Sequence, residues 1–175
     1  MPLQRRSLLL ALGAGAALPL LQACGGSDGH EPGTIVALAA GDSRFSILVE
    51  AVTAAGLVDT LNSTGPFTVF APTNSAFAAL LTELNVTKEA LLANNALLTS
   101  VLTYHVVTGA LRAQDVAALP KPATVATVQG ASFTVDASLA ITDARNRRAQ
   151  LVATDLIASN GVVHAIDTVL LPPAG

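Results

Sequence analysis

The sequence has one cysteine, no tryptophan and one tyrosine, and aromatic residues make up only 3% of its 175 residues. A single cysteine excludes a disulfide framework within the chain. The scarcity of aromatic side chains argues against an aromatic platform on which nucleobases or sugars stack. Charged residues amount to 12% and the formal net charge is −3, so we expect no nucleic-acid partner.

Motifs that bind metals or activate a nucleophile are also missing. The chain has no Gly-x-Ser-x-Gly elbow, no His-x-x-x-His pair and no cluster of cysteine and histidine, so we expect neither a metal nor a cofactor. What the chain does have is hydrophobic residues, at 51%. This content excludes a disordered protein and is enough for one domain with an aliphatic core.

The first residues have the pattern of an export signal. Arg5-Arg6 precede an apolar run from Ser7 to Leu21, which is too short to span a membrane as a helix. The run ends in Leu21-Gln22-Ala23-Cys24, which resembles the bacterial lipobox. The resemblance implies a signal peptide over residues 1–23 and a lipid-modified Cys24, hence a protein held at the cell envelope. The arginine pair also resembles a twin-arginine signal, so both export routes stay open.

A flexible spacer and one folded domain follow the leader. Residues 24–33 are rich in glycine, serine and charge and show no apolar period, which is typical of a linker. Because Gly25 rather than aspartate follows the cysteine, the lipobox resemblance implies transfer to an outer membrane if the host has one. We expect the folded domain to span residues 34–173, since no change of composition marks a second one.

The stretch Phe67 to Phe77 predicts a strand, a turn and the start of a helix. Phe67 and Val69 alternate with Thr68 and Phe70 at the period of two that a strand imposes. Helical spacing begins at Phe77, and Thr73 or Asn74 can cap that helix by accepting a backbone N–H bond. Pro72 favours extended backbone just before the change.

Helices are expected mainly in the N-terminal half and strands in the C-terminal half. Two helical stretches are expected at residues 34–40 and 113–119. Three more begin at capping residues: Asp42 or Ser43 (ended by Gly56), Thr73 or Asn74, and Thr87. A last one ends near Tyr104, where a strand begins. Residues 57–61 fit either strand or helix. The later strands are 124–128, 132–136, 139–142, 149–153 and 161–170. This order favours an α+β fold with antiparallel sheets over an alternating parallel fold.

Three stretches together resemble the fasciclin (FAS1) domain family. They are the Phe67 to Phe77 stretch, the pair Tyr104-His105, and the run from Asn160 to Pro172. The resemblance covers residues 34–173 and implies a wedge of two β-sheets with helices packed against it. It also implies adhesion or matrix interaction rather than catalysis, and some relatives use the Tyr-His pair to adhere to a receptor. The candidate interaction or motif residues are Thr73, Asn74, Tyr104, His105, Asn160, Gly161, His164 and Asp167.

Strand alternation in the last motif places His164 on one face and Asp167 on the other, each among apolar neighbours. Both need hydrogen-bond partners, across the sheet or at the Thr73-Asn74 loop, because an unpaired buried polar group costs about 1–3 kcal/mol. Asn160-Gly161 predicts a tight turn, since both residues tolerate positive φ.

Alternative interpretations of the polar residues remain. His105 and His164 with Asp155, Asp167 and a serine could form a triad on paper, but most chains of this length contain such residues, and we favour buried core histidines. Arg145, Arg147 and Arg148 surround a predicted hairpin turn. Those three are either solvated or a contact for an anionic polysaccharide or lipid headgroup.

The leading hypothesis is a non-enzymatic, exported adhesion domain, lipid-anchored at the cell envelope, that binds a surface or matrix protein or polysaccharide. The alternative is carriage of an apolar small ligand such as a carotenoid, as in some fasciclin-like proteins that this chain resembles; its aliphatic composition suits an apolar cleft. Ester hydrolysis is a third hypothesis and requires a nucleophile.

Overall fold

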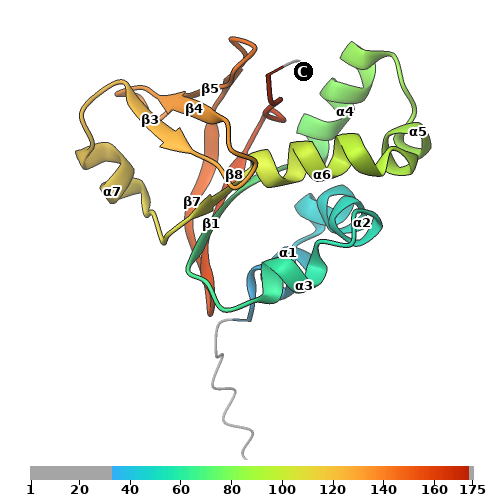
Figure 1. Cartoon of the computed structure of the whole chain (residues 1–175), viewed down its shortest axis with the longest axis horizontal. Helices are drawn as coiled ribbons and strands as arrows, with labels where there is room; N and C mark the ends of the chain where they lie inside the picture. Colours follow the sequence, from blue (N-terminus) through green and yellow to red (C-terminus); the bar gives the residue numbers. More distant parts are fainter. Residues whose placement is uncertain (1–32, 174–175) are drawn as a thin grey trace, which may run out of the picture.

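The computed structural model describes residues 33–173. The predicted signal peptide over residues 1–23, the predicted lipidation site Cys24 and the predicted spacer as far as residue 32 lie outside these described residues. A central sheet separates two layers (Figure 1). Helices α1 to α6 cover one face of the sheet, and a second, smaller sheet with α7 covers the other. The predicted α+β class, with two sheets and mainly N-terminal helices, is confirmed.

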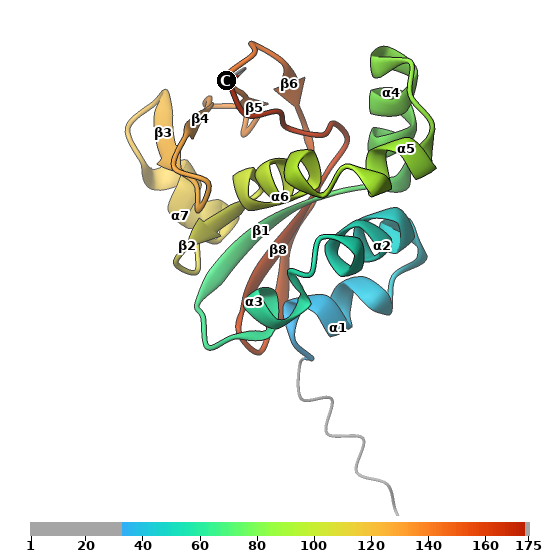
Figure 2. The ribbon, with the colours of Figure 1, turned by 45° about the vertical axis from the view of Figure 1, so that its right-hand side comes forward.

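Side-chain caps start most of the helices. Thr34, Thr73, Thr87 and Asn94 each accept a bond from a backbone N–H of the first turn, which satisfies a donor that the helix leaves free. Residues 57–61, left open between strand and helix, lie mainly in helix. The helices are α1 (Ile35–Ala40), the 3₁₀ turn η1 (Ser43–Phe45), α2 (Ser46–Ala54), α3 (Val58–Asn62), α4 (Asn74–Leu84), α5 (Lys88–Ala93), α6 (Asn95–Tyr104) and α7 (Ala113–Ala118). Figure 2 shows α6 lying across the central sheet.

The central sheet has the order β2-β1-β8-β7. Its strands are β1 (Phe67–Pro72), β2 (Val106–Thr108), β7 (Leu151–Ala158) and β8 (Gly161–Ile166). β1 is antiparallel to β2 but parallel to β8, with Phe70 opposite His164, so the prediction of purely antiparallel sheets is wrong for this pair. Strands buried on both faces show continuous apolar runs, as in parallel sheets, and both β1 and β8 fit that description.

The second sheet has the order β3-β4-β5-β6, all antiparallel. Its strands are β3 (Ala123–Ala126), β4 (Ser132–Val135), β5 (Ile141–Thr142) and β6 (Arg148–Ala149). The predicted strand 149–153 is wrong as one unit, because Ala149 belongs to β6 and Leu151 begins β7 in the central sheet. The predicted strand 161–170 ends at Ile166. Beyond it, the side chains of His105 and Asp143 accept hydrogen bonds from the backbone N–H groups of Leu170 and Leu171.

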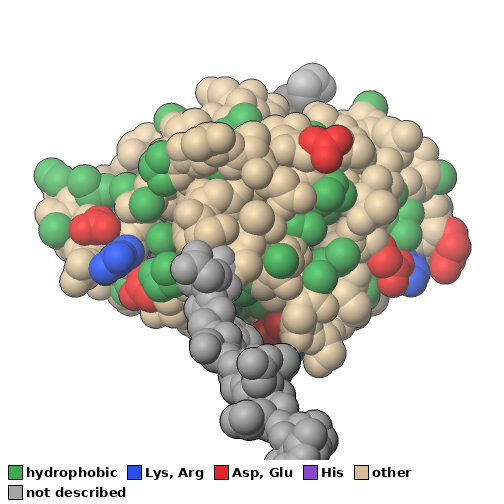
Figure 3. All heavy atoms as spheres, turned by 90° about the horizontal axis from the view of Figure 1, so that it is seen from below, with side chains coloured by type: hydrophobic (Ala, Val, Ile, Leu, Met, Phe, Trp, Pro, Cys, Tyr) green, Lys and Arg blue, Asp and Glu red, His purple; other side chains and the backbone are tan. Residues whose placement is uncertain are grey.

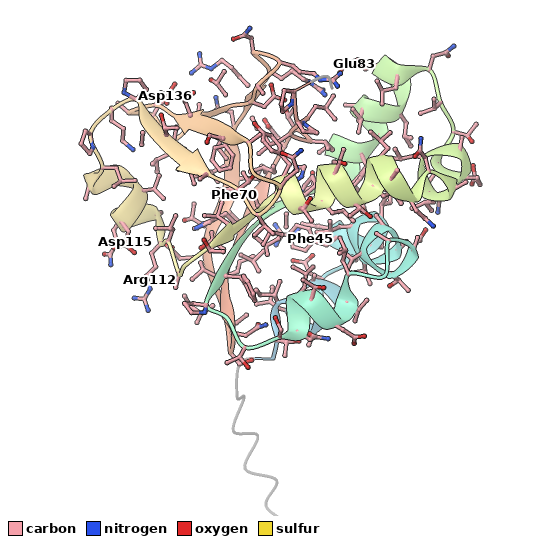
Figure 4. All side chains as sticks on the ribbon, viewed as in Figure 1. Phe45, Phe70, Glu83, Arg112, Asp115 and Asp136 are labelled. Atoms are coloured by element: carbon pink, nitrogen blue, oxygen red, sulfur yellow. The ribbon has the colours of Figure 1, made fainter. Side chains whose placement is uncertain are left out.

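Two cores lie on the two faces of the central sheet. Val69 packs with the helices, whereas Phe70, its neighbour on β1, packs with the second sheet against Phe133 at 5.1 Å between ring centroids. Figure 4 shows Phe45 among the helices and Phe70 between the sheets. The alternation predicted for residues 67–70 is therefore confirmed, and it assigns consecutive side chains to different cores.

Among residues 33–173, no helix is both long enough and apolar enough to cross a membrane.

Candidate functional site

Thr73 and Asn74 have different roles at the start of α4. The Thr73 hydroxyl accepts the N–H of Ala76 at 3.4 Å and caps the helix. The Asn74 side chain instead reaches back to the first helices: its carbonyl oxygen accepts the N–H of Ile47 at 3.1 Å, and its amide donates to the carbonyl of Ser43 at 2.9 Å. Of the two predicted caps, Thr73 is the cap, and Asn74 ties α4 to α2.

The pair Tyr104-His105 lies in the core and reaches no surface. The Tyr104 hydroxyl donates to the carbonyl of Ser132 at 2.9 Å and accepts the N–H of Ala144 at 3.2 Å, so it connects α6 to two parts of the second sheet. Its side chain is fully buried, and burial raises the pKa of the phenol. A partner protein therefore has no access to Tyr104 in this conformation.

His105 connects the end of α6 to the C-terminal segment. Its Nδ1–H donates to the carbonyl of Val101 at 2.7 Å, and its Nε2 accepts the N–H of Leu170 at 3.0 Å. These two partners fix the neutral tautomer and occupy both ring nitrogens. Burial lowers the pKa of His105 from 6.5 to about 4. The ring is therefore a neutral structural link rather than a general base at neutral pH.

Asp143 belongs to the same region, although its sequence context did not mark it as a site residue. It is buried, and its carboxylate accepts backbone N–H bonds from Arg145, Arg147 and Leu171 at 2.8 to 2.9 Å. The Asp143-Ala144-Arg145-Asn146 pattern indicated only a turn. The burial of Asp143 depends on the C-terminal segment, where the backbone N–H of Leu171 needs a partner once β8 has ended.

His164 is buried on the β8 face that packs toward the second sheet, with its ring 5.4 Å from that of Phe70. Its Nε2–H donates to the carbonyl of Leu111 at 2.8 Å, and its Nδ1 accepts the N–H of Asp155 at 3.2 Å. The Asp155 carboxylate accepts the N–H of Ala113, at the start of α7. His164 and Asp155 thus hold the loop before α7 against the sheet. Of the two partners predicted for His164, the one across the sheet is confirmed, because Asp155 lies on β7, and the Thr73-Asn74 loop is not used.

Asn160 and Gly161 form the turn between β7 and β8 and also clamp the start of the domain. The Asn160 side-chain oxygen accepts the N–H of Ile35 at 3.0 Å, and its amide donates to the carbonyls of Leu61 at 2.6 Å and Ser63 at 3.1 Å. A Cβ on Gly161 would lie 2.0 Å from the carbonyl oxygen of Phe67, so only glycine allows β1 and β8 to approach this closely.

Asp167 is exposed, so the expectation of a carboxylate among apolar neighbours is wrong. β8 has already ended at Ile166, and the strand alternation on which the expectation rested does not continue. The Oδ1 atom of Asp167 accepts the N–H of Gln150 at 2.8 Å and the hydroxyl of Thr168 at 3.0 Å. Its Oδ2 atom has no hydrogen-bond partner among residues 33–173.

The arginines near residues 145–148 mostly hold the structure together. Arg147 pairs with Glu83 at 2.6 Å, and Arg148 pairs with Asp136. Arg145 donates to the carbonyl of Pro172 at 3.0 Å. Each of the three arginines thus has a partner within residues 33–173, although Nη1 of Arg147 is buried without one. Figure 4 shows Glu83 and Asp136 at separate places on the rim of the molecule.

Three hollows lie near the candidate residues. An apolar cavity of about 60 Å³ lies between α1 to α3 and the β1, β2 and α6 region. The turn groove, of about 400 Å³, is formed by residues 64–66, 110, 112 and 157–162. The polar groove, of about 520 Å³, is lined by Ser43, Arg44, Thr73, Asn74, Ser75, Val152 and Asp167. Of the eight candidates, three therefore meet in the polar groove and two in the turn groove, while Tyr104, His105 and His164 are buried.

These positions favour binding over reaction chemistry. Both nitrogens of each buried histidine are already hydrogen-bonded to the backbone, and neither ring contacts a serine hydroxyl. Within residues 33–173, no three His, Cys, Asp or Glu side chains are grouped to hold a metal ion. At the end where the described chain begins, Figure 3 shows charged side chains of both signs next to one another, mainly at two opposite edges of the molecule.

Comparison with known proteins gives a consistent result. Residues 43–172 match the family model described as the Fasciclin domain. Protein sll1483 from Synechocystis sp. is 46% identical over 144 residues, which cover 80% of this chain and 74% of that protein. The cell surface glycolipoprotein MPB83 of Mycobacterium bovis is 42% identical over 118 residues, covering 67% of this chain and 49% of that one.

A solved structure shows the same fold. The FAS1 domain pair of the insect cell adhesion molecule fasciclin I superposes with a TM-score of 0.70 at 18% identity, and the match covers 79% of this chain and 51% of that one.

Proposed function

The chain belongs to the fasciclin domain family, and from that premise we propose that it is a non-enzymatic adhesion domain that binds a cell-surface or matrix protein or polysaccharide. The observation that supports the proposal is the separation of roles among the signature residues. Tyr104, His105 and His164 are buried and bonded within the domain. Asp167 has one carboxylate oxygen without a hydrogen-bond partner among residues 33–173, and it lies at an open groove of about 520 Å³ that Thr73 and Asn74 also line.

We also propose that the protein is exported and anchored to the envelope through a lipidated Cys24. The lipobox-like sequence before Cys24 supports this, as does the similarity to a mycobacterial protein named as a cell surface glycolipoprotein. Two or more acyl chains on one residue give stable anchoring where a single chain does not. Residues 24–33 then serve as a short spacer between the bilayer and a domain over residues 34–173, and the outer membrane is the expected location where the host has one.

A capture experiment tests the adhesion proposal. The mature protein is immobilised on beads and incubated with solubilised envelope extract and with purified matrix polysaccharide, and an unrelated lipoprotein on identical beads is the control. We expect specific retention of at least one component. Equal retention on both kinds of bead for every fraction would refute the proposal.

A second candidate function is carriage of a small apolar ligand, such as a carotenoid. The supporting observation is the apolar cavity, whose lining is mostly aliphatic and includes Leu48, Val52 and Val69. At about 60 Å³ the cavity admits only a few heavy atoms, so a polyene would require α1 to α3 to move outward from the sheet. Protein purified from a carotenoid-producing host should then absorb visible light, and a colourless preparation would count against carriage.

A further inference from the structure

The polar groove brings together four parts of the chain that are distant in sequence. Ser43 and Arg44 come from η1, residues 73–75 from the start of α4, Val152 from β7 and Asp167 from the segment after β8. No single motif of the sequence predicts this meeting. The arrangement gives one open hollow with donors, an acceptor and an apolar surface in it.

Several polar atoms of the groove are not used by the fold. Asn74 is fully bonded, but the hydroxyls of Ser43 and Ser75 have no hydrogen-bond partner among residues 33–173. The Oδ2 atom of Asp167 is likewise a free acceptor in that part of the chain, because Gln150 and Thr168 both bond to Oδ1. The groove therefore offers both hydroxyl donors and a carboxylate acceptor.

The charges around the groove limit the kind of ligand. The guanidinium of Arg44 is already paired with Asp42 at 2.6 Å, so its positive charge is largely balanced. Asp167 has no ion pair among residues 33–173 and adds one negative charge. An anionic ligand would be repelled by this carboxylate. A neutral ligand that both donates and accepts hydrogen bonds suits the groove better.

Val152 supplies the remaining feature. Its side chain is 56% exposed, the largest exposure among the large hydrophobic residues described, and it lines the groove. Apolar surface beside polar groups fits a molecule with hydroxyls on its edge and C–H groups on its face, which describes a pyranose ring. The chain has few aromatic side chains with which to stack a sugar, so an aliphatic surface takes that role with a weaker contact.

From these contacts we infer that the polar groove binds a neutral polysaccharide through the sugar hydroxyls, with Asp167 and Ser75 as the main polar contacts and Val152 against the ring face. This inference rests on the proposed adhesion function and names the class of its partner. A protein partner bound elsewhere on the domain is the competing outcome.

The test is an NMR titration of the mature protein with neutral tetrasaccharides of glucose (α1–4 and β1–4), mannose and xylose, and with a galacturonate oligomer as the anionic comparison. We expect at least one neutral oligomer to shift the amide signals of Arg44, Ser75, Val152 and Asp167, and galacturonate to bind more weakly. Asp167→Asn replaces the free carboxylate acceptor with a neutral N–H₂ donor, and Ser75→Ala removes a hydroxyl, so each should weaken binding about tenfold.

The two groove variants should remain folded, and a control variant outside the groove shows whether an effect on binding is specific. Asn at position 167 can still accept the N–H of Gln150 through its side-chain oxygen, and Ser75 makes no side-chain bond to the described fold, so both variants should remain folded. Asp59→Asn removes an exposed carboxylate from α3, outside the groove, and should leave binding unchanged. If no neutral oligomer binds, or if the two groove variants bind as well as the parent, the inference is wrong. Retention of an envelope protein in the capture experiment would then leave the adhesion proposal standing by itself.

Discussion

Replacing His105 with glutamine tests whether this residue is a neutral link in the core. In the folded protein its pKa is lowered from 6.5 to about 4, because the buried ring has no contact with water and its charged form is therefore disfavoured. The unfolded state therefore binds the proton more readily. Stability from this residue is fully present above pH 6.5 and is lost as the pH falls toward 4.

The magnitude follows from the size of the shift. A change of about 2.5 pKa units at about 1.4 kcal/mol per unit corresponds to about 3 kcal/mol of unfolding free energy between pH 7 and pH 4. His105→Gln does not titrate in this range. The glutamine amide can donate to the carbonyl of Val101 and its oxygen can accept the N–H of Leu170, so the variant should fold, and the contribution of residue 105 to its stability should not depend on pH.

The assay is urea unfolding followed by circular dichroism at several pH values from 7 to 4. The carboxylates that also titrate are common to both proteins, so their contributions cancel in the difference between them. We expect the difference in stability between parent and variant to shrink by about 3 kcal/mol as the pH falls. A variant whose stability falls with pH as steeply as that of the parent would refute the reasoning.

Three further substitutions test the hydrogen bonds and the close packing that stabilise the domain. Asn160→Ala removes three side-chain hydrogen bonds and should lower stability by about 2–4 kcal/mol, seen in chemical denaturation. Thr73→Ala removes the cap of α4 and should lower stability by about 1 kcal/mol in the same assay. Gly161→Ala places a methyl group against the carbonyl of Phe67 and should cost more than about 4 kcal/mol or prevent folding, measured by thermal melting and yield.

Each of these substitutions has a milder counterpart. Asn160→Asp keeps an acceptor for the N–H of Ile35, and Thr73→Ser keeps the capping hydroxyl, so both should lose less stability than the alanine variants. Gly130→Ala tests a glycine whose Cβ would meet open space, and its loss should come only from the positive φ of 100°. Equal losses at Gly130 and Gly161 would contradict the role assigned to the close approach of β1 and β8.

Local signals in the sequence were enough for the element that begins at Phe67. The strand period, the change to helical spacing and the threonine cap all depend on residues within a few positions of each other. The structure has the expected strand and helix, and the end of α6 at Tyr104 followed by β2 was predicted for the same reason.

Partners distant in sequence were harder to predict. The parallel pairing of β1 with β8 joins segments about ninety residues apart, and no local period distinguishes it from antiparallel pairing. Asp167 was assigned to a strand face because the apolar run continues past it, yet the ladder stops at Ile166. Asp143 was seen as a turn residue, because its burial depends on where the C-terminal segment passes.

The candidate site shows the same division. The three signatures identified the family and the residues that make hydrogen bonds within the domain. They did not identify the polar groove, where some polar atoms have no hydrogen-bond partner among residues 33–173. Ser75, Val152 and Arg44 belong to the groove only because η1, α4 and β7 meet there, and only the folded chain brings them together.

The most direct test of the account is a comparison of capture by folded variants. Immobilised parent protein, Tyr104→Phe and His105→Gln are exposed at pH 7 to the same envelope extract and polysaccharide, and the retained material is divided by the folded fraction of each sample. The account predicts specific retention that is the same for all three, because Tyr104 and His105 are buried and act only on stability. Loss of retention by a variant that is fully folded, or no retention by the parent protein, would contradict it.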